Sequence, residues 1–285
     1  MRYFRPRSLD EALSRLAEFD DARPIAGGAT LVAMMNADLL APGALVSLAA
    51  IDELAGICAG ADGIVIGAMT RHATVAADQR LLGDSAIVRL AAAEIGHPAI
   101  RAVGTIGGSL AHADPAADYP TALTAAGADI EILGSGGRRR VAAAGFFEDF
   151  YTTALADGEL ITAVHVPAPR VGGIAVYRKI ARSDGDFAIA SIAFSGVFDG
   201  DRCRDARVVV GGCGPTPVRS DTVDAMLVDT SPGDPRLTDA AATLAAACDP
   251  MDDVRGSAHY RRLLVRRLLP HVFAEACAAA RAQSA

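Results

Sequence analysis

The chain has 285 residues, of which 51% are hydrophobic and 21% are charged, and its formal net charge is -7. This composition is that of a globular protein and excludes a disordered one, and the acidic balance argues against nucleic acid as the main partner. The length favours two domains, or one domain with a large appendage.

The cysteine pattern and the N-terminal residues indicate the cellular compartment of the protein. The five cysteines are odd in number and include no C-x-x-C pair. Iron–sulfur, zinc and disulfide sites are therefore not expected within this chain. The first residues reach charged side chains too early for a signal peptide, and no segment is long and apolar enough to span a bilayer. We expect a cytoplasmic protein with reduced thiols.

The first part of the chain predicts alternating helices and strands. A helix is expected over Ser8–Phe19, because Ser8 and Glu11 form a capping box and apolar residues then recur at helical spacing. The elements expected next are a strand that ends in glycines at Arg23–Gly28, a helix opening at Thr30–Met35, strands at Ala44–Ala49 and Ile64–Gly67, a helix around Leu90–Ile95, a strand at Ala128–Leu133, a hairpin turn at Gly134–Gly137 and a strand at Glu159–Val166.

A break in composition at Pro167–Gly173 predicts a linker or crossover. Strands are expected after it at Ile174–Lys179, Ala188–Phe198 and Ala206–Gly211, and helices at Leu237–Cys248 and Ser257–Ala280. Strands followed by helices indicate a second domain of the α+β class.

Two short segments rich in glycine suggest a ligand. The first glycine segment is Ala26–Thr30, which follows a predicted strand, and the second is Thr105–Ser109. Glycine lets backbone N–H groups approach an anion, and a helix that opens next adds partial positive charge. Asp114 and Asp118 could accept hydrogen bonds from sugar hydroxyls, and Ser109 could donate to a phosphate. The pair suggests one extended ligand with a pyrophosphate; two structural turns are the alternative.

Long ordered motifs carry a resemblance to a known family. They include F-R-P-R-S-L-D-E-A-L, A-G-G-A-T-L, I-G-H-P-A-I-R-A-V-G-T-I-G-G-S-L-A-H-A-D-P-A-A-D-Y-P, Y-R-K-I-A-R-S-D-G-D-F-A-I-A and V-V-V-G-G-C-G-P-T-P-V-R. In these motifs the chain resembles, over essentially its whole length, the FAD-binding medium subunit of the molybdenum hydroxylases, such as carbon monoxide dehydrogenase. It is also similar to the flavin domain of xanthine dehydrogenase.

The resemblance implies an α+β fold with two parts. A FAD-binding domain of the vanillyl-alcohol oxidase (PCMH) type is expected over residues 1–169, with subdomains of about 1–55 and 56–169. A smaller α+β domain, like the C-terminal domain of the carbon monoxide dehydrogenase flavoprotein, is expected over 174–285.

The resemblance also implies cofactor-binding residues, matched position by position. The two glycine segments match the pyrophosphate loops, although the family usually has a polar residue where Ala29 stands. Asp118 matches an aspartate near the adenosine end, and Lys179 matches a lysine that reaches the isoalloxazine ring. The full set comprises Ala26, Gly27, Gly28, Ala29, Thr30, Ile95, Thr105, Ile106, Gly107, Gly108, Ser109, Asp118, Ile161, Lys179 and Phe187. No residue of this chain is implied as a catalytic group or a metal ligand.

The implied function is electron transfer in an oxidoreductase. In such an enzyme a large subunit holds molybdopterin and molybdenum, a small subunit carries [2Fe-2S] clusters, and FAD in this chain passes electrons to an external acceptor. The resemblance implies a heterohexamer with two copies of each subunit, no transmembrane segment and no nucleic acid, and leaves peripheral membrane association open. Two alternatives remain: a free-standing FAD oxidoreductase of the same fold, and a non-catalytic assembly protein that has lost FAD.

Overall fold

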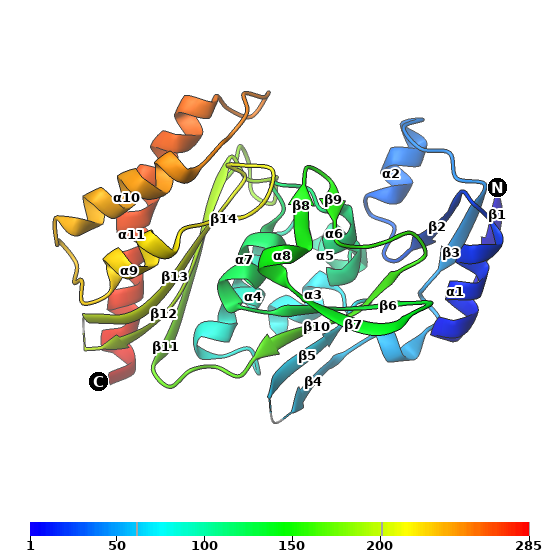
Figure 1. The fold of residues 1–285 in the computed structure, drawn as a ribbon, viewed down its shortest axis with the longest axis horizontal. Coiled ribbons are helices and arrows are strands. Elements are labelled where there is room, and N and C mark those ends of the chain that lie inside the picture. Colours follow the sequence, from blue (N-terminus) through cyan, green and yellow to red (C-terminus); the bar gives the residue numbers. More distant parts are fainter. Residues whose placement is uncertain (61, 201, 285) are drawn as a thin grey trace.

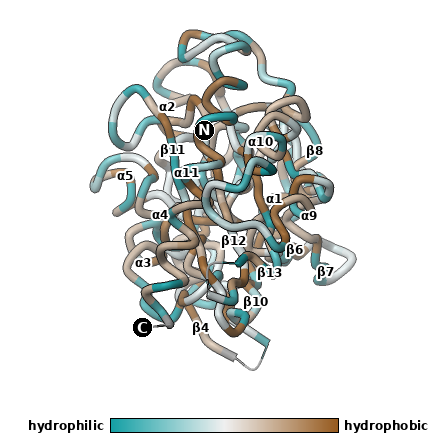
Figure 2. Tube along the Cα trace, turned by 90° about the vertical axis from the view of Figure 1, so that its left-hand side faces the viewer, coloured by the Kyte–Doolittle hydropathy of each residue, from teal (hydrophilic) through white to brown (hydrophobic). Residues whose placement is uncertain are grey.

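The computed structural model describes residues 1–60, 62–200 and 202–284 of the chain. Its three main sheets follow one another along the chain. Figure 1 shows them from right to left, with helices packed between and around them. In Figure 2 the hydrophobic colour runs along interior strands and helices, and the hydrophilic colour marks many outer loops.

The N-terminal sheet is parallel, in the order β1-β3-β2. Its elements, with the helices beside it, are β1 (Arg2–Phe4), α1 (Leu9–Glu18), β2 (Ala22–Ile25), α2 (Leu31–Asn36) and β3 (Ala44–Ser47). The predicted cap of α1 is confirmed, since the Ser8 side chain accepts a hydrogen bond from the Glu11 N–H at 3.2 Å. The Glu11 carboxylate reaches back to the N–H of Arg7, one residue before the cap.

The central sheet is antiparallel, in the order β4-β5-β10-β6-β7. Its strands are β4 (Ile57–Gly60), β5 (Gly63–Gly67), β6 (Asp129–Gly134), β7 (Gly137–Ala142) and β10 (Leu160–Pro167). The remaining elements of this part are η1 (Asp52–Leu54), α3 (His72–Ala77), η2 (Gly83–Ala86), α4 (Ile87–Glu94), α5 (Pro98–Val103), α6 (Ile106–His112), α7 (Asp118–Ala126), α8 (Ala143–Phe146), β8 (Phe147–Asp149) and β9 (Thr152–Thr153). The predicted strands and the β6–β7 hairpin turn are confirmed.

The residue types of the second glycine segment suggested a loop, but in the structure most of the segment belongs to a helix. Gly107 and Gly108 lie in the first turn of α6, whose N-terminus is capped by the Thr105 side chain. The small residues allow close packing, because a Cβ on Gly107 would lie only 2.6 Å from the Cβ of Ala68. Farther along, α7 is buried from Asp118 to Ala125, so the segment that looked too poor in bulk for a core forms part of one.

The C-terminal sheet is antiparallel, in the order β11-β12-β13-β14, and has helices on both faces. The residues of one face, represented by the cross-strand neighbours Tyr177, Ala193 and Val209, join the core that contains α4 and α7. The other face packs against the C-terminal helices. The elements are β11 (Gly173–Ile180), β12 (Ala190–Asp199), β13 (Arg202–Gly211), β14 (Val218–Arg219), α9 (Asp221–Leu227), α10 (Arg236–Ala247) and α11 (Ala258–Ser284), which confirms the predicted strands and helices here.

Arg170, in the connection between β10 and β11, ties the central part to the C-terminal sheet. Its backbone N–H and its Nε donate to the two carboxylate oxygens of Asp84 at 2.9 and 2.5 Å. Its guanidinium also donates to Ser195 Oγ at 3.0 Å and pairs with Asp205. The Asp84 side chain is only 10% exposed, so these hydrogen bonds are largely shielded from water.

Replacing Asp84 with alanine is expected to lower the free energy of unfolding by about 1–2 kcal/mol, because the partly buried Arg170 side chain and backbone N–H lose a charged acceptor that is largely shielded from water. Urea denaturation of the full chain measures the change. Asp221→Ala is the matched control, since Asp221 also pairs with an arginine but its side chain is 89% exposed. An exposed pair contributes little, so equal losses in the two variants would contradict this role of Asp84.

Candidate functional site

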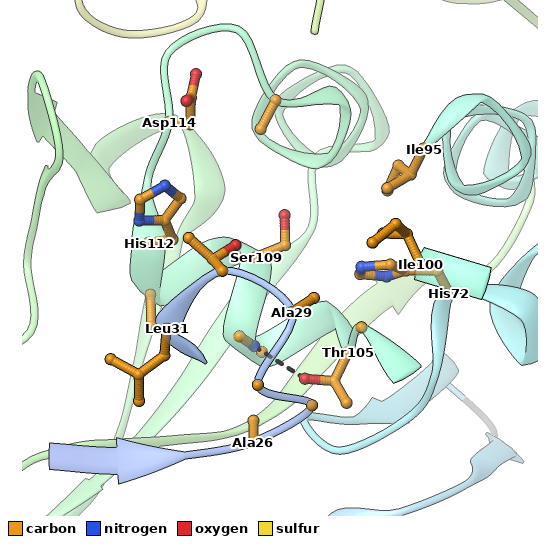
Figure 3. Close-up of a pocket in the computed structure, with 18 of the residues that line it drawn as sticks. Ala26, Ala29, Leu31, His72, Ile95, Ile100, Thr105, Ser109, His112 and Asp114 are labelled. Carbon is orange, nitrogen blue, oxygen red and sulfur yellow. Dashed lines mark hydrogen bonds between the residues drawn. The ribbon is translucent and has the colours of Figure 1, made fainter. Parts of the chain in front are cut away.

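A cavity of about 830 Å³ opens between the N-terminal sheet, the helices α4 to α6 and the loop after β11. A volume of this size suits a small-molecule ligand or cofactor. It is lined by thirteen of the fifteen residues predicted to bind the cofactor: Ala26, Gly27, Gly28, Ala29, Thr30, Ile95, Thr105, Gly107, Gly108, Ser109, Asp118, Ile161 and Phe187. Figure 3 shows several of them facing the cavity from separate elements.

The first glycine segment offers a run of unpaired backbone donors. Among the hydrogen bonds of the described residues, none comes from the amide N–H groups of residues 27–31. The turn is tight, because Gly28 has a φ of +76°, which favours glycine. Consecutive free N–H groups between a strand and a helix form a site for an anion, so this segment fits a pyrophosphate.

The two glycine segments meet although they are far apart in sequence. A Cβ on Gly27 would collide with the carbonyl oxygen of Val103 and lie 3.0 Å from the Cα of Gly104. A Cβ on Gly108 would lie 3.5 Å from the Cβ of Ala26. Glycines at these contacts allow the first segment to approach the start of α6 closely, and the two segments form one wall of the cavity.

The second glycine segment cannot offer free backbone N–H groups as the first does, because those of Gly107, Gly108 and Ser109 already have acceptors. The N–H of Gly107 donates to the carbonyl of Ala68 at 2.8 Å, and the N–H of Ser109 donates to that of Thr105 at 3.0 Å. The N–H of Gly108 is taken by the Thr105 hydroxyl at 3.2 Å. This segment therefore offers the Ser109 hydroxyl, which Figure 3 shows on the cavity side.

Asp118, Lys179 and Tyr177 form a buried polar cluster at the edge of the cavity. The Lys179 ammonium lies 3.1 Å from one carboxylate oxygen of Asp118 and donates to the carbonyl of Glu94 at 2.7 Å. The Tyr177 hydroxyl donates to Asp118 at 2.6 Å. The two charged side chains are 2% and 6% exposed. Burial raises the pKa of Asp118, opposed by the neighbouring Lys179 charge and the Tyr177 hydrogen bond.

This cluster joins Asp118 and Lys179 in one ion pair, whereas the resemblance implies roles for them near different parts of the cofactor. Of the two, only Asp118 lines the cavity, and Lys179 is paired with it. Lys179 is also the sole lysine among 27 lysine and arginine residues. That signal was available in the sequence, and our prediction did not use it.

Ile106 is the second predicted residue that the structure does not bring to the cavity. Its side chain is fully buried in the core and its N–H donates to the carbonyl of Thr70 at 3.0 Å, so neither is available to a ligand. By contrast, Ile95, Ile161 and Phe187 do line the cavity. Phe187 is 38% exposed, and the Arg255 guanidinium lies 5.4 Å from the centre of its ring.

Sequence reasoning gave no role to His72, His112 or Tyr151, and suggested only hydrogen bonding to sugar hydroxyls for Asp114. His72 lines it and is buried, with Nδ1 3.2 Å from the hydroxyl oxygen of Tyr119. His112 and Asp114 line it as well, and Tyr151 donates to Asp114 at 3.3 Å. His112, Asp114 and Tyr119 lie in one of the family motifs, whereas His72 on α3 and Tyr151 between β8 and β9 are brought to them only by the fold.

The described residues offer neither a membrane-spanning helix nor a cluster of metal ligands. In residues 1–60, 62–200 and 202–284, no helix combines the length and the apolar character that a membrane span requires. Within the same ranges, no three His, Cys, Asp or Glu side chains gather in a way that could hold a metal ion.

Family models match both parts of the chain. The model described as the FAD binding domain in molybdopterin dehydrogenase matches residues 1–169. The model described as the CO dehydrogenase flavoprotein C-terminal domain matches residues 175–276.

Individual proteins are similar over nearly the whole chain. The carbon monoxide dehydrogenase medium chain of Afipia carboxidovorans is 38% identical over 261 residues, covering 91% of this chain and 90% of the relative. The glyceraldehyde dehydrogenase medium chain of Sulfolobus acidocaldarius is 34% identical over 273 residues, covering 96% and 97%. A crystal structure of the Cu,Mo-CO dehydrogenase superposes with a TM-score of 0.93 at 35% identity and covers 98% of each chain. These matches confirm the predicted fold, a FAD-binding domain followed by a C-terminal domain.

Proposed function

The chain belongs to the family of FAD-binding subunits of molybdopterin dehydrogenases, and from this premise we propose that it binds FAD in the cavity between its two glycine segments. The protein is the FAD-carrying electron-transfer subunit of a multi-subunit molybdenum hydroxylase, an oxidoreductase. Thirteen of the predicted residues would hold the cofactor directly, and Lys179 would act on it through Asp118.

The observation that carries this assignment is the run of unpaired N–H groups at residues 27–31 on the cavity wall. These donors fit the charge of a pyrophosphate, and Ser109 adds a hydroxyl from the facing segment. Bound FAD would supply the ability to accept electrons singly and release them in pairs. The chain's own task would be to hold the two halves of FAD in place and to set the polarity around the ring.

The assembly and the domain limits are also proposals. Relatives such as the carbon monoxide dehydrogenase medium chain are named as medium chains, which supports partner subunits here. We propose a small [2Fe-2S] subunit and a large molybdopterin subunit, with two copies of each chain, in the cytoplasm. The FAD-binding domain would span residues 1–169, with subdomains of about 1–55 and 56–169, and the C-terminal domain 174–285.

The protein isolated from its native host is expected to show flavin bands together with iron–sulfur absorbance. Two companion chains should be present, and acid release should yield about one FAD per copy of this chain. Visible spectroscopy, mass analysis of the co-purified chains and chromatography of the released flavin measure these outcomes. The matched sample is the same chain produced alone, which lacks the companions.

Two other outcomes would support the alternatives. A flavin spectrum on a chain that has no partners in its native host would indicate a free-standing FAD oxidoreductase. A native protein with partners but without flavin would indicate a non-catalytic assembly protein and would contradict FAD binding in the cavity.

A further inference from the structure

His72 holds a fixed position beside the cavity. It is the first residue of α3 and is only 4% exposed. Its backbone N–H donates to the carbonyl of Gly104 at 3.0 Å. The preceding residue, Arg71, forms an antiparallel bridge with Thr105. The imidazole is therefore anchored to the connection that leads into the second glycine segment.

The hydrogen bond to Tyr119 indicates which ring nitrogen of His72 carries the proton. Tyr119 is completely buried, and its hydroxyl lies 3.2 Å from His72 Nδ1, its one partner among the described hydrogen bonds. A buried hydroxyl hydrogen needs an acceptor. If Nδ1 carried a proton, the Tyr119 hydrogen would have no acceptor. The arrangement therefore favours Tyr119 donating to Nδ1, which leaves the proton of the neutral ring on Nε2.

The Nε2 atom lies next to Gly104, a backbone neighbour of the first glycine segment. A Cβ on Gly104 would be only 2.6 Å from it, and Gly104 in turn packs against Gly27. Figure 3 shows the ring facing the cavity, across from Ala29 and near Thr105. The ring is neutral at physiological pH, because burial and the nearby Arg101 charge lower the pKa of His72 to about 4.

We propose that His72 is a further cofactor-positioning residue, which Tyr119 holds in the Nε2–H form and which donates from Nε2 to an oxygen of the FAD pyrophosphate. The inference rests on the proposed function, since it needs FAD in this cavity. It adds a side-chain donor to the backbone donors of residues 27–31. Such a donor contributes a directed hydrogen bond to the anion without adding a charge beside the flavin.

The test measures binding to the full chain by titration. The probes are FAD, ADP, which has the pyrophosphate but no flavin, and riboflavin, which has no phosphate. His72→Phe is expected to raise the Kd of FAD and the inhibition constant of ADP by roughly 10–100-fold and to leave the Kd of riboflavin unchanged. His72→Gln keeps an N–H donor on a side chain of similar length and should stay within about threefold of wild type for FAD and ADP. Tyr119→Phe should fall between the two.

The wild-type chain provides a second measurement that needs no substitution. Nitrogen-15 NMR of the histidine rings at pH 7 should show His72 protonated at Nε2 and unprotonated at Nδ1. A proton on Nδ1, or a charged ring, would overturn the inference. Unchanged FAD and ADP binding in a folded His72→Phe would overturn it too, as would a loss of riboflavin affinity. A wild-type chain that binds no FAD would instead overturn the proposed function, and the inference with it.

Discussion

Replacing Gly27 with valine is expected to abolish FAD binding, with a Kd at least about 100-fold above that of the wild type, the scale expected when several charge-assisted hydrogen bonds are lost together. A Cβ at this position would collide with the Val103 carbonyl oxygen and press on Gly104. Because these atoms are backbone, the clash cannot be relieved by a side-chain rotation. The first glycine segment would have to move away from the start of α6, which would misalign its free N–H groups.

Flavin fluorescence titration measures the loss for Gly27→Val. Gly145→Val is the matched control, because Gly145 is exposed on α8 and a Cβ there would meet nothing within 4 Å. Circular dichroism should show that both variants keep the wild-type helix content. Full FAD occupancy in Gly27→Val would contradict the placement of the pyrophosphate in this segment.

Replacing Lys179 with methionine is expected to lower the free energy of unfolding by about 3–5 kcal/mol, because the buried carboxylate of Asp118 would lose its cation. Urea denaturation of the full chain measures this loss. The neighbouring Arg178→Met is the matched control, since its side chain is 56% exposed and pairs with Glu275 at the surface. A double variant with Asp118→Asn should recover part of the loss, because no unpaired charge would remain buried.

The loss in Lys179→Met should also depend on pH. Burial already raises the pKa of Asp118 above its usual 3.8, and the Lys179 charge opposes that shift. Without Lys179, the folded-state pKa should rise further. Below the unfolded-state pKa of Asp118, the carboxyl group is neutral in both states, and its burial is tolerated. As the pH rises through the folded-state pKa, the buried group becomes a carboxylate without a cation, and the variant loses stability. The difference from wild type should therefore be small near pH 4 and grow toward neutral pH. A loss independent of pH would contradict the ion pair.

Local signals in the sequence were sufficient for much of the fold. The capping residues of α1 and the glycine-rich turn after β6 predicted those elements. The second glycine segment was misread, because its small residues are typical of a loop but here serve the close packing of α6 on Ala68. The strand β7 was not predicted either. It carries three consecutive arginines at the sheet edge, where exposure removes the alternating pattern.

Residues of the candidate cavity could be predicted where they belong to a sequence motif. Side-chain pairs that depend on tertiary packing could not. Twelve of the thirteen predicted residues that line the cavity lie in the quoted family motifs, whereas Ile106 within a motif is buried in the core. The pairing of Asp118 with Lys179 joins α7 to β11, and that of His72 with Tyr119 joins α3 to α7. Such pairs depend on how helices pack on the sheets, which the spacing of residues in the sequence does not reveal.

The burial of Lys179 has a consequence for the chemistry of the protein surface. As the only lysine, it holds the only side-chain amine, and its side chain is 2% exposed. Reagents that acylate or crosslink amines can then reach only the α-amino group of the folded chain. The ε-amine would become reactive when the contact between α7 and β11 opens. Mass spectrometry of acylated Lys179 would therefore measure that opening without an introduced label.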